Sequence, residues 1–456
     1  MLSIRFMLIL GIVFSISACS SDTMDETIDE VETPNEEEPP VQGDRPNILL
    51  IIADDMGVDA TPSFASELNA TKPVMPTLSN LMDTELVFDN LWSYALCSPT
   101  RASILTGKHG FSNGVLAPIR GTMSGAHKSI HSYLDEQTNN AYAHAVFGKW
   151  HLGAVTTHPT QTMGVGTYSG NLSGGVSSFW DYSLVVNEEE TISNVYSTTQ
   201  YTQLAIDWKN EQTKPWFIWL AYNAAHTPFH RPDNTVLDVN SPSRSLPDYV
   251  AGQSAPLPYY LAMLEAMDFE MGRLINGMSE TERENTVIIF IGDNGSPKKV
   301  DQYPGTKHGK GSIYQGGVNV PLVISGNGVR LGREESALLN TTDLFATIAE
   351  IAGVTMASVY HHSQSFKDLL YDENATTREF VYVEVPGDGD NGSYAVRNAD
   401  YKLIHEIDSG REEMYHIVED ANETNDLLSE DHVLTSEEMQ NLTELQDEGL
   451  RLRNES

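Results

Sequence analysis

Five continuous apolar runs limit what this chain can fold into. Each run has the length of one strand and offers no polar face, which suits a strand that is covered on both sides. Segments with helical spacing, such as "YTQLAIDWKNEQ" and "YYLAMLEAMDFEMGRLINGM", stand between them. This alternation predicts an α/β domain with a mostly parallel central sheet flanked by helices. The runs are "NILLIIA" (47–53), "AYAHAVF" (141–147), "PWFIWLAY" (215–222), "TVIIFIG" (286–292) and "VPLVISG" (320–326).

The pattern changes after "DLFATIAEIAG". Short alternating runs follow, namely "EFVYVEV", "SYAVRNADYKLIHEI" and "EMYHIV", and then the polar helical segment "SEEMQNLTELQDEGLRLRN". These predict a small C-terminal domain with an antiparallel sheet and one helix. The chain beyond its first 45 residues exceeds the usual size of a single core, about 250–300 residues. We therefore expect a large domain over 46–355 and a C-terminal subdomain over 356–456.

The first residues predict export. Residues 1–18 combine Arg5 with the apolar run "FMLILGIVF", which is too short for a membrane span and is typical of a signal peptide. The run ends in "ISAC", which resembles the lipobox of bacterial lipoproteins and implies a lipid on Cys19. An ordinary signal peptide cut near Ala18 is the alternative. Residues 19–45 are acidic and proline-rich, and we expect them to be a disordered tether. We expect a lipoprotein of the outer membrane or cell surface, with a periplasmic orientation as the alternative.

Polar side chains stand where four of the apolar runs end. In open α/β sheets, ligands bind at the carboxyl ends of the strands. Taken singly, a pair of aspartates after a strand is often a turn or a helix cap, and a lone histidine is often structural. Their joint occurrence predicts one site at this edge. The residues are Asp54 and Asp55, Lys149 and His151, His226, and Asp293 and Asn294.

A lone cysteine, Cys97, opens the stretch "CSPTRASILTG". Because Cys19 is cut off or lipidated, it does not pair with Cys97, and a buried, inert thiol is the simplest interpretation. The other motifs argue otherwise: "PNILLIIADDMG", "GKWHLG", "AHTPF", "GDNG" and "GKGSIYQGGVNVPLVISG". With these, the chain from about residue 46 to its carboxyl end resembles the type I sulfatases of the alkaline-phosphatase superfamily. The Cys-x-Pro-x-Arg core of that family reads here as Cys97, Pro99 and Arg101.

The resemblance implies that Cys97 is oxidised to Cα-formylglycine by a formylglycine-generating or other sulfatase-maturating enzyme. One hydroxyl of the hydrated aldehyde attacks sulfur and expels the substrate alcohol. Deprotonation of the second hydroxyl then ejects sulfate without another attack at sulfur. By the same resemblance, His226 protonates the leaving alcohol and His151 removes the later proton, roles that suit imidazoles near neutral pH.

The resemblance also implies a divalent cation. A shell of carboxylate, amide and formylglycine oxygens suits Ca²⁺ better than Mg²⁺, which demands tighter geometry, and no cysteine and histidine cluster with zinc spacing is present. Arg101 would hold the modified residue, while Lys149 and Lys310 would bind sulfate oxygens. The implied metal ligands are Asp54, Asp55, Cys97, Asp293 and Asn294.

The sequence departs from the family where "QGGVNVP" places Gln315 and Asn319. We expect catalysis to survive this change, because these positions lie outside the implied ligand shell, but substrate preference does not transfer closely. His308 either reaches the substrate or is a structural loop histidine. Several aromatic residues could stack on a sugar, although packing is the commoner role for such positions. These are Tyr168, Phe179, Trp180, Tyr182, Tyr259 and Tyr260.

The balance of 27 basic against 64 acidic residues gives a net charge of −37. It argues against nucleic acid as a partner and predicts long-range repulsion of a sulfated polyanion. High salt shortens the range of that repulsion, so the acidic surface is compatible with a saline setting. A marine algal polysaccharide is the substrate hypothesis that follows. Three functions remain: a sulfatase acting on sulfated carbohydrate, a phosphonate or phosphodiester hydrolase of the same superfamily, and a catalytically silent glycan-binding lipoprotein. The complete set of implied metal ligands argues against the third.

Overall fold

A computed structural model of the chain describes residues 45–64, 68–118, 123–357, 359–387 and 392–454. The predicted signal peptide, Cys19 and the tether up to residue 44 lie outside these ranges. Within them, no helix is both long enough and apolar enough to cross a membrane.

The central sheet has eleven described strands in the order β10-β2-β9-β8-β1-β7-β3-β4-β5-β6, with β11 beside β2. The neighbours β8, β1, β7, β3 and β4 run parallel. Strand β9 runs antiparallel to β8 and β2, and β5 runs antiparallel to β4. The prediction of a mostly parallel sheet is therefore confirmed. The strands are β1 (Asn47–Ala53), β2 (Leu86–Trp92), β3 (Ala143–Lys149), β4 (Thr167–Asn171), β5 (Tyr182–Val186), β6 (Glu189–Ser193), β7 (Trp216–Ala221), β8 (Thr286–Gly292), β9 (Asn319–Ser325), β10 (Gly332–Glu335) and β11 (Leu339–Asn340).

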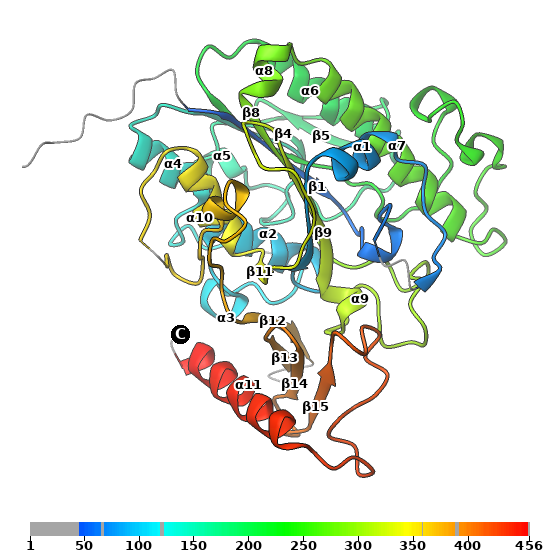
Figure 1. Ribbon diagram of the computed structural model, residues 1–456. Coiled ribbons are helices and arrows are strands. Elements are labelled where there is room, and N and C mark those ends of the chain that lie inside the picture. The colour runs from blue at the N-terminus through cyan, green and yellow to red at the C-terminus, as the bar shows by residue number, and fades with distance from the viewer. Residues whose placement is uncertain (1–44, 65–67, 119–122, 358, 388–391, 455–456) are drawn as a thin grey trace, which may run out of the picture. The chain divides into compact units, whose positions relative to one another are not determined.

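Helices cover both faces of this sheet (Figure 1). Every residue of β1 is buried, and its side chains alternate between two cores: Leu49 and Ile51 belong to one, Ile48 and Leu50 to the other. One core includes residues of α1 (Pro76–Thr84), α6 (Ser197–Asn210) and α7 (Leu257–Asn276). The other includes residues of α2 (Cys97–Thr106), α4 (Ile130–Thr138) and α10 (Asp343–Ile351). Burial on both faces explains why the strands read as unbroken apolar runs.

The C-terminal part forms an antiparallel sheet in the order β12-β13-β14-β15 and one long helix, as predicted. One face of this sheet packs against Trp92, Tyr94 and Val318, and the other packs against the helix. Its elements are β12 (Val381–Pro386), β13 (Gly392–Arg397), β14 (Tyr401–Glu406), β15 (Glu412–His416) and α11 (Ser436–Asn454). The remaining short helices are α3 (Gly110–Asn113), α5 (Pro159–Thr162), α8 (Glu280–Glu284) and α9 (Gln315–Val318).

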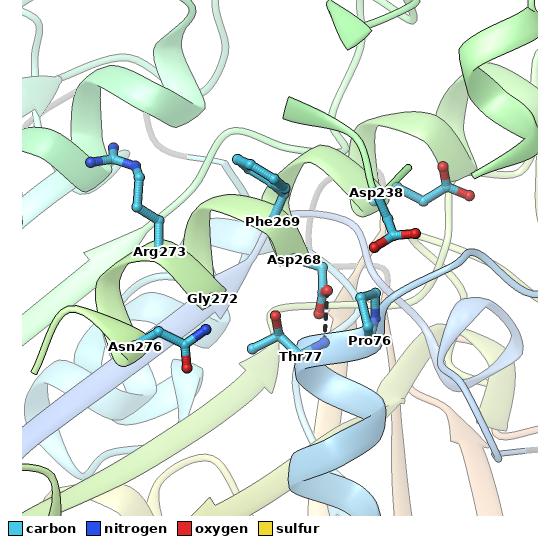
Figure 2. A pocket seen from close by; sticks show the side chains of 9 residues that line it. Pro76, Thr77, Asp238, Asp268, Phe269, Gly272, Arg273 and Asn276 are labelled. Atoms are coloured by element: carbon cyan, nitrogen blue, oxygen red, sulfur yellow. Dashed lines mark hydrogen bonds between the residues drawn. The ribbon is translucent and has the colours of Figure 1, made fainter. Parts of the chain in front are cut away.

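A pocket of about 320 Å³ lies where α7 meets the start of α1, and Figure 2 shows Asp268 pointing at that helix end. The carboxylate of Asp268 accepts the N–H groups of Thr77 (2.9 Å) and Leu78 (2.7 Å), which have no partner within the first turn of α1. Burial raises the pKa of Asp268 from the ordinary 3.8 to about 7, although these hydrogen bonds oppose the rise. The buried carboxylate of this pocket, Asp268, therefore serves the helix start.

Candidate active site

The carboxyl ends of the neighbouring strands β1 and β8 bring the predicted acidic residues together. Ala53 lies opposite Gly292 in the parallel pairing, so Asp54 and Asp293 leave the sheet side by side. The amide of Asp293 donates to the carbonyl of Ala53 (3.1 Å), and the amide of Asp55 donates to Oδ1 of Asp293 (3.0 Å). Asp55 has a left-handed backbone (φ 63°), which is uncommon outside glycine and typical of functional turns.

These residues offer oxygen donors that fit a divalent cation. Ligand atoms of Asp54, Cys97 and Asp293 all lie within 4.8 Å of one another, and all three residues are buried. The Nδ2 of Asn294 donates to Oδ1 of Asp55 (2.8 Å). Its other amide atom, Oδ1, is buried and has no hydrogen-bond partner among the described residues. A buried amide oxygen without a donor is costly, and a cation would satisfy it.

Three basic side chains contact the three carboxylates of this site. Lys149 Nζ donates to both oxygens of Asp54 (2.8 and 2.7 Å), and neither side chain is exposed. Arg101 Nη2 donates to Oδ2 of Asp293 (2.8 Å), and Lys310 Nζ donates to Oδ1 of Asp55 (2.5 Å). Each buried carboxylate thus has a cationic partner, which is what burial of charge requires.

The environments of the two adjacent aspartates push their pKa values apart. Burial raises the pKa of Asp54 to about 6, against the pull of Lys149 and with the help of Asp293. Burial alone would also raise the pKa of Asp55. The charges of Lys310, His226 and Lys149 outweigh burial and hold the pKa of Asp55 below its usual range. A cation at these oxygens would favour the ionised form of both.

Cys97 is the first residue of α2, a helix whose ten residues are all buried. Its thiol therefore lies at the helix N-terminus, where the helix dipole favours negative charge. Arg101 stands one turn further on the same face and also donates to the carbonyl of Lys149 (3.0 Å). The helix ends at Gly107, whose left-handed conformation (φ 65°) glycine adopts without steric cost.

His151 lies beside Cys97, with its Nδ1 atom 3.2 Å from Sγ. Its backbone is left-handed (φ 58°), and its carbonyl accepts the hydroxyl of Ser98 (2.9 Å). Burial, followed by the charges of Lys149 and Arg101, lowers the pKa of His151 to about 2. The ring is therefore neutral near pH 7.

His226 lies on the segment that leaves β7 and is held against Asp54. The amide of Asp54 donates to the carbonyl of Ala224 (2.9 Å), and the amide of Ala225 donates to the carbonyl of Asp54 (2.7 Å). The half-buried ring of His226 donates from Nδ1 to the carbonyl of Thr227 (2.9 Å). Its Nε2 atom is the ring nitrogen that remains for proton exchange.

Two glycines that the sequence analysis did not single out pack against these histidines. A Cβ atom on Gly174 would lie 2.2 Å from Nε2 of His151, and one on Gly175 would lie 3.2 Å from Cε1 of His226. The segment after β4 therefore forms a wall of the site. The glycine pair in "NLSGGVSS" indicates a turn at most, so this contact was not predictable from the residue pattern.

Several candidates have structural roles instead. His308 is buried, its Nε2 lies 3.1 Å from the carbonyl of Asn422, and its Nδ1 accepts the amide of Gly316 (3.4 Å), so it has no ring nitrogen left for a substrate. Gln315 accepts the Nε1–H of Trp92 (2.9 Å), and Asn319 donates to the carbonyl of Asp89 (2.9 Å). Of the six aromatic candidates, Trp180 is partly exposed and the others are buried: Tyr168, Phe179, Tyr182, Tyr259 and Tyr260.

A mixed α/β sheet with oxygen donors at two strand ends, beside a cysteine at the head of a buried helix, fits the alkaline-phosphatase superfamily. A family model described as Sulfatase matches residues 46–354, and one described as N-sulphoglucosamine sulphohydrolase, C-terminal, matches residues 307–448. The chain belongs to the sulfatase family, whose members are sulfuric ester hydrolases.

Relatives and solved structures agree with this family. Arylsulfatase J of Mus musculus is 26% identical over 331 residues, which is 68% of this chain and 52% of that protein. A protein named Sulfatase from Formosa agariphila is 24% identical over 495 residues, with 85% of each chain covered. The chain thus spans about half the length of the mouse relative. The crystal structure of Ps i-CgsB in complex with k-i-k-neocarrahexaose has a TM-score of 0.73 at 24% identity and covers 90% of this chain and 93% of that chain, a likeness of fold.

Proposed function

We propose that this protein hydrolyses sulfate esters of a sulfated polysaccharide or oligosaccharide, with Cys97 converted to formylglycine as the nucleophile. The observation that carries the proposal is the placement of Cys97 at a buried helix N-terminus, 3.2 Å from His151. Family membership supports the reaction class. The carbohydrate substrate is supported by the similarly folded Ps i-CgsB, which was crystallised with k-i-k-neocarrahexaose.

Three basic residues have proposed roles around the nucleophile and the sulfate group. Lys149 and Lys310 would bind sulfate oxygens, and the contacts of their ammonium groups with Asp54 and Asp55 place both at the site. Arg101 would hold residue 97 in place from one turn along α2. When formed, the hydrated aldehyde supplies a nucleophile that can release sulfate without a second attack at sulfur. The three basic groups balance the three carboxylates of the site, so a bound cation would supply the positive charge that offsets the net charge of −37 there.

Two histidines divide the proton transfers. His226 would donate a proton from Nε2 to the leaving alcohol oxygen, since its Nδ1 is bound to the carbonyl of Thr227. His151 would accept a proton at Nδ1 from the group at position 97, which lies within hydrogen-bond reach of this atom.

We propose Ca²⁺ as the resident cation, held by residue 97 and four oxygen donors. The unpartnered Oδ1 of Asn294 and the close approach of Asp54 and Asp293 support this assignment. When bound, the cation supplies positive charge that favours an ionised nucleophile and offsets charge on the sulfuryl oxygens. The four donors are Asp54, Asp55, Asp293 and Asn294.

Mass spectrometry of the peptide that contains Cys97 tests this proposal together with activity. Protein made in a host with a maturating enzyme should carry formylglycine, about 18 Da lighter than cysteine. It should release sulfate from sulfated oligosaccharides, and Cys97→Ala should not. A fully active preparation with only the thiol would overturn the mechanism. Faster cleavage of aryl phosphonate or phosphate than of aryl sulfate would assign the chain to phosphoryl chemistry instead.

We also propose that a lipid on Cys19 anchors the protein at the outer membrane or cell surface. The support is the sequence "ISAC" after an apolar leader, followed by an acidic tether. Two or more acyl chains give stable attachment, whereas one gives marginal binding. Cys19→Ala should move the protein to the soluble fraction, and continued membrane association would contradict the anchor.

A further inference from the structure

Residues 307–318 link the active site to the C-terminal sheet, and we call this segment the Lys310 loop. The ammonium group of Lys310 contacts Asp55 at 2.5 Å. The amide of Lys310 donates to the carbonyl of Ser296, and the amide of Gly311 donates to the carbonyl of Ala95, both at 2.8 Å. Two consecutive peptide groups thus fix the middle of the loop to the catalytic body.

The C-terminal subdomain holds the Lys310 loop on both sides of this point. Its contacts involve a ring nitrogen, a phenol hydroxyl and a backbone amide of the loop, so they fix the main chain as well as side chains. The contacts are His308 Nε2 with the carbonyl of Asn422 (3.1 Å), Tyr314 hydroxyl with Glu413 Oε2 (2.6 Å) and Gln315 amide with Glu423 Oε2 (2.5 Å).

A buried ion pair lies at the centre of these contacts. Lys402 of β14 donates to Glu423 Oε1 at 2.5 Å, and neither side chain is exposed. Lys402 also donates to the carbonyl of Ile313 (2.8 Å), while Glu423 accepts the amide of Gln315. Burying two charges costs free energy unless their remaining donors and acceptors are satisfied. Here backbone groups of the Lys310 loop satisfy both partners.

We propose that Lys402 and Glu423 are positioning residues for Lys310. A pair of apolar side chains would fill the same space but would leave the Ile313 carbonyl and the Gln315 amide without partners. The ion pair fixes these two backbone groups, and the loop in turn keeps the Lys310 ammonium on Asp55. The C-terminal subdomain thereby contributes to the reaction without touching the substrate. The kinetic consequence rests on the proposed sulfatase function.

Kinetics of Glu423→Gln in the full-length protein test the proposal, because glutamine keeps the size and removes the charge. We expect kcat/KM on an aryl sulfate to fall about 100-fold, the effect of a misplaced group. In a Lys310→Ala background, Glu423→Gln should lower kcat/KM by less than about threefold, since the ammonium group that the ion pair positions is absent. Glu384→Gln is the matched control, because Glu384 pairs with Arg453 and accepts the Phe111 amide away from the loop. Equal losses in both Lys310 backgrounds would overturn the proposal.

Amide hydrogen exchange over residues 307–318 gives a readout that needs no substrate. Exchange there should accelerate in Glu423→Gln and stay unchanged in Glu384→Gln. If Glu423→Gln does not fold, Lys402→Met combined with Glu423→Gln removes both charges and leaves no unpaired ion. Unchanged exchange in the ion-pair variants would refute the positioning role. A parent protein that cleaves no sulfate ester would contradict the proposed function instead, and the exchange result would still decide the role of the pair.

Discussion

Gly174 touches the ring of His151, and Gly174→Ala is the sharpest test of the proposed base. The added methyl group would lie 2.2 Å from Nε2 and 2.3 Å from Cε1 of that ring. The backbone of Gly174 is not left-handed, so alanine can adopt its conformation. The conflict therefore falls on the imidazole rather than on the main chain.

The size of the effect follows from this overlap. Non-bonded heavy atoms pack at about 3.5 Å, so the ring must retreat by roughly 1.3 Å. A displacement of this size would disturb the placement of Nδ1 beside residue 97, where it now lies 3.2 Å from Sγ of Cys97. A misplacement of about 1 Å can cost about 100-fold in rate, or about 2.7 kcal/mol in the activation barrier. Stability should fall by about 1–3 kcal/mol, the usual cost of an added methyl group that displaces a packed side chain.

Steady-state kinetics on nitrophenyl sulfate check this expectation, with equal modification of Cys97 verified in parent and variant. Gly175→Ala is the comparison, because its methyl group would lie 3.2 Å from the His226 ring and needs a shift of only a few tenths of an ångström. Gly175→Ala should lower the rate by less than about tenfold. A Gly174→Ala enzyme within threefold of the parent would mean that the position of His151 does not control the rate.

Three other results follow from the site and the fold. His226→Ala should lower the activity on a sugar sulfate by about 10²- to 10⁴-fold and the activity on nitrophenyl sulfate much less, because a good leaving group needs little protonation. Equal losses of activity on the two substrates would assign the proton-donor role to Lys310 instead. Removal of divalent cations by a chelator should abolish activity, and Ca²⁺ should restore it better than Mg²⁺; recovery with Mg²⁺ alone would contradict the calcium assignment. Burial raises the pKa of Asp268 in the folded state to about 7, from the ordinary 3.8. Between pH 4 and 7 the native state therefore binds more protons than the unfolded state, and it loses stability as the pH rises. The stability of Asp268→Asn relative to the parent should therefore grow across this window, by at most about 4 kcal/mol, and denaturant unfolding that shows a constant difference would refute the argument.

The apolar runs predicted the centre of the sheet well, because buried parallel strands carry their signal in every residue. The five predicted runs became β1, β3, β7, β8 and β9 with small shifts at their ends. The direction of β9 was not predictable from its composition. It runs antiparallel to β8, since the connection between them contains only the short helix α9 rather than a full crossover helix. Strands with exposed positions, such as β6, carried too weak a pattern to identify.

The candidate site was predictable where strand ends decide it. Asp54 and Asp293 follow adjacent parallel strands, so topology alone brings them together. Contacts set by loop packing gave no comparable signal: Gly174 meets His151 only because the segment after β4 folds back over the ring. The aromatic candidates failed for a related reason. Composition does not separate a ring that packs in the core, such as Tyr260, from one that faces solvent.

Because α2 is buried, the proposed modification of Cys97 would have to precede the completion of folding. Cys97 is 2% exposed, and all ten residues of its helix are covered by the finished fold. A maturating enzyme that must grip several residues around the thiol has no access to them once the helix has docked. Under the proposed chemistry, oxidation therefore competes in time with folding during biosynthesis. A chain that folds before it is oxidised keeps its thiol. The active fraction of a preparation would therefore equal the fraction of chains that were oxidised before they folded.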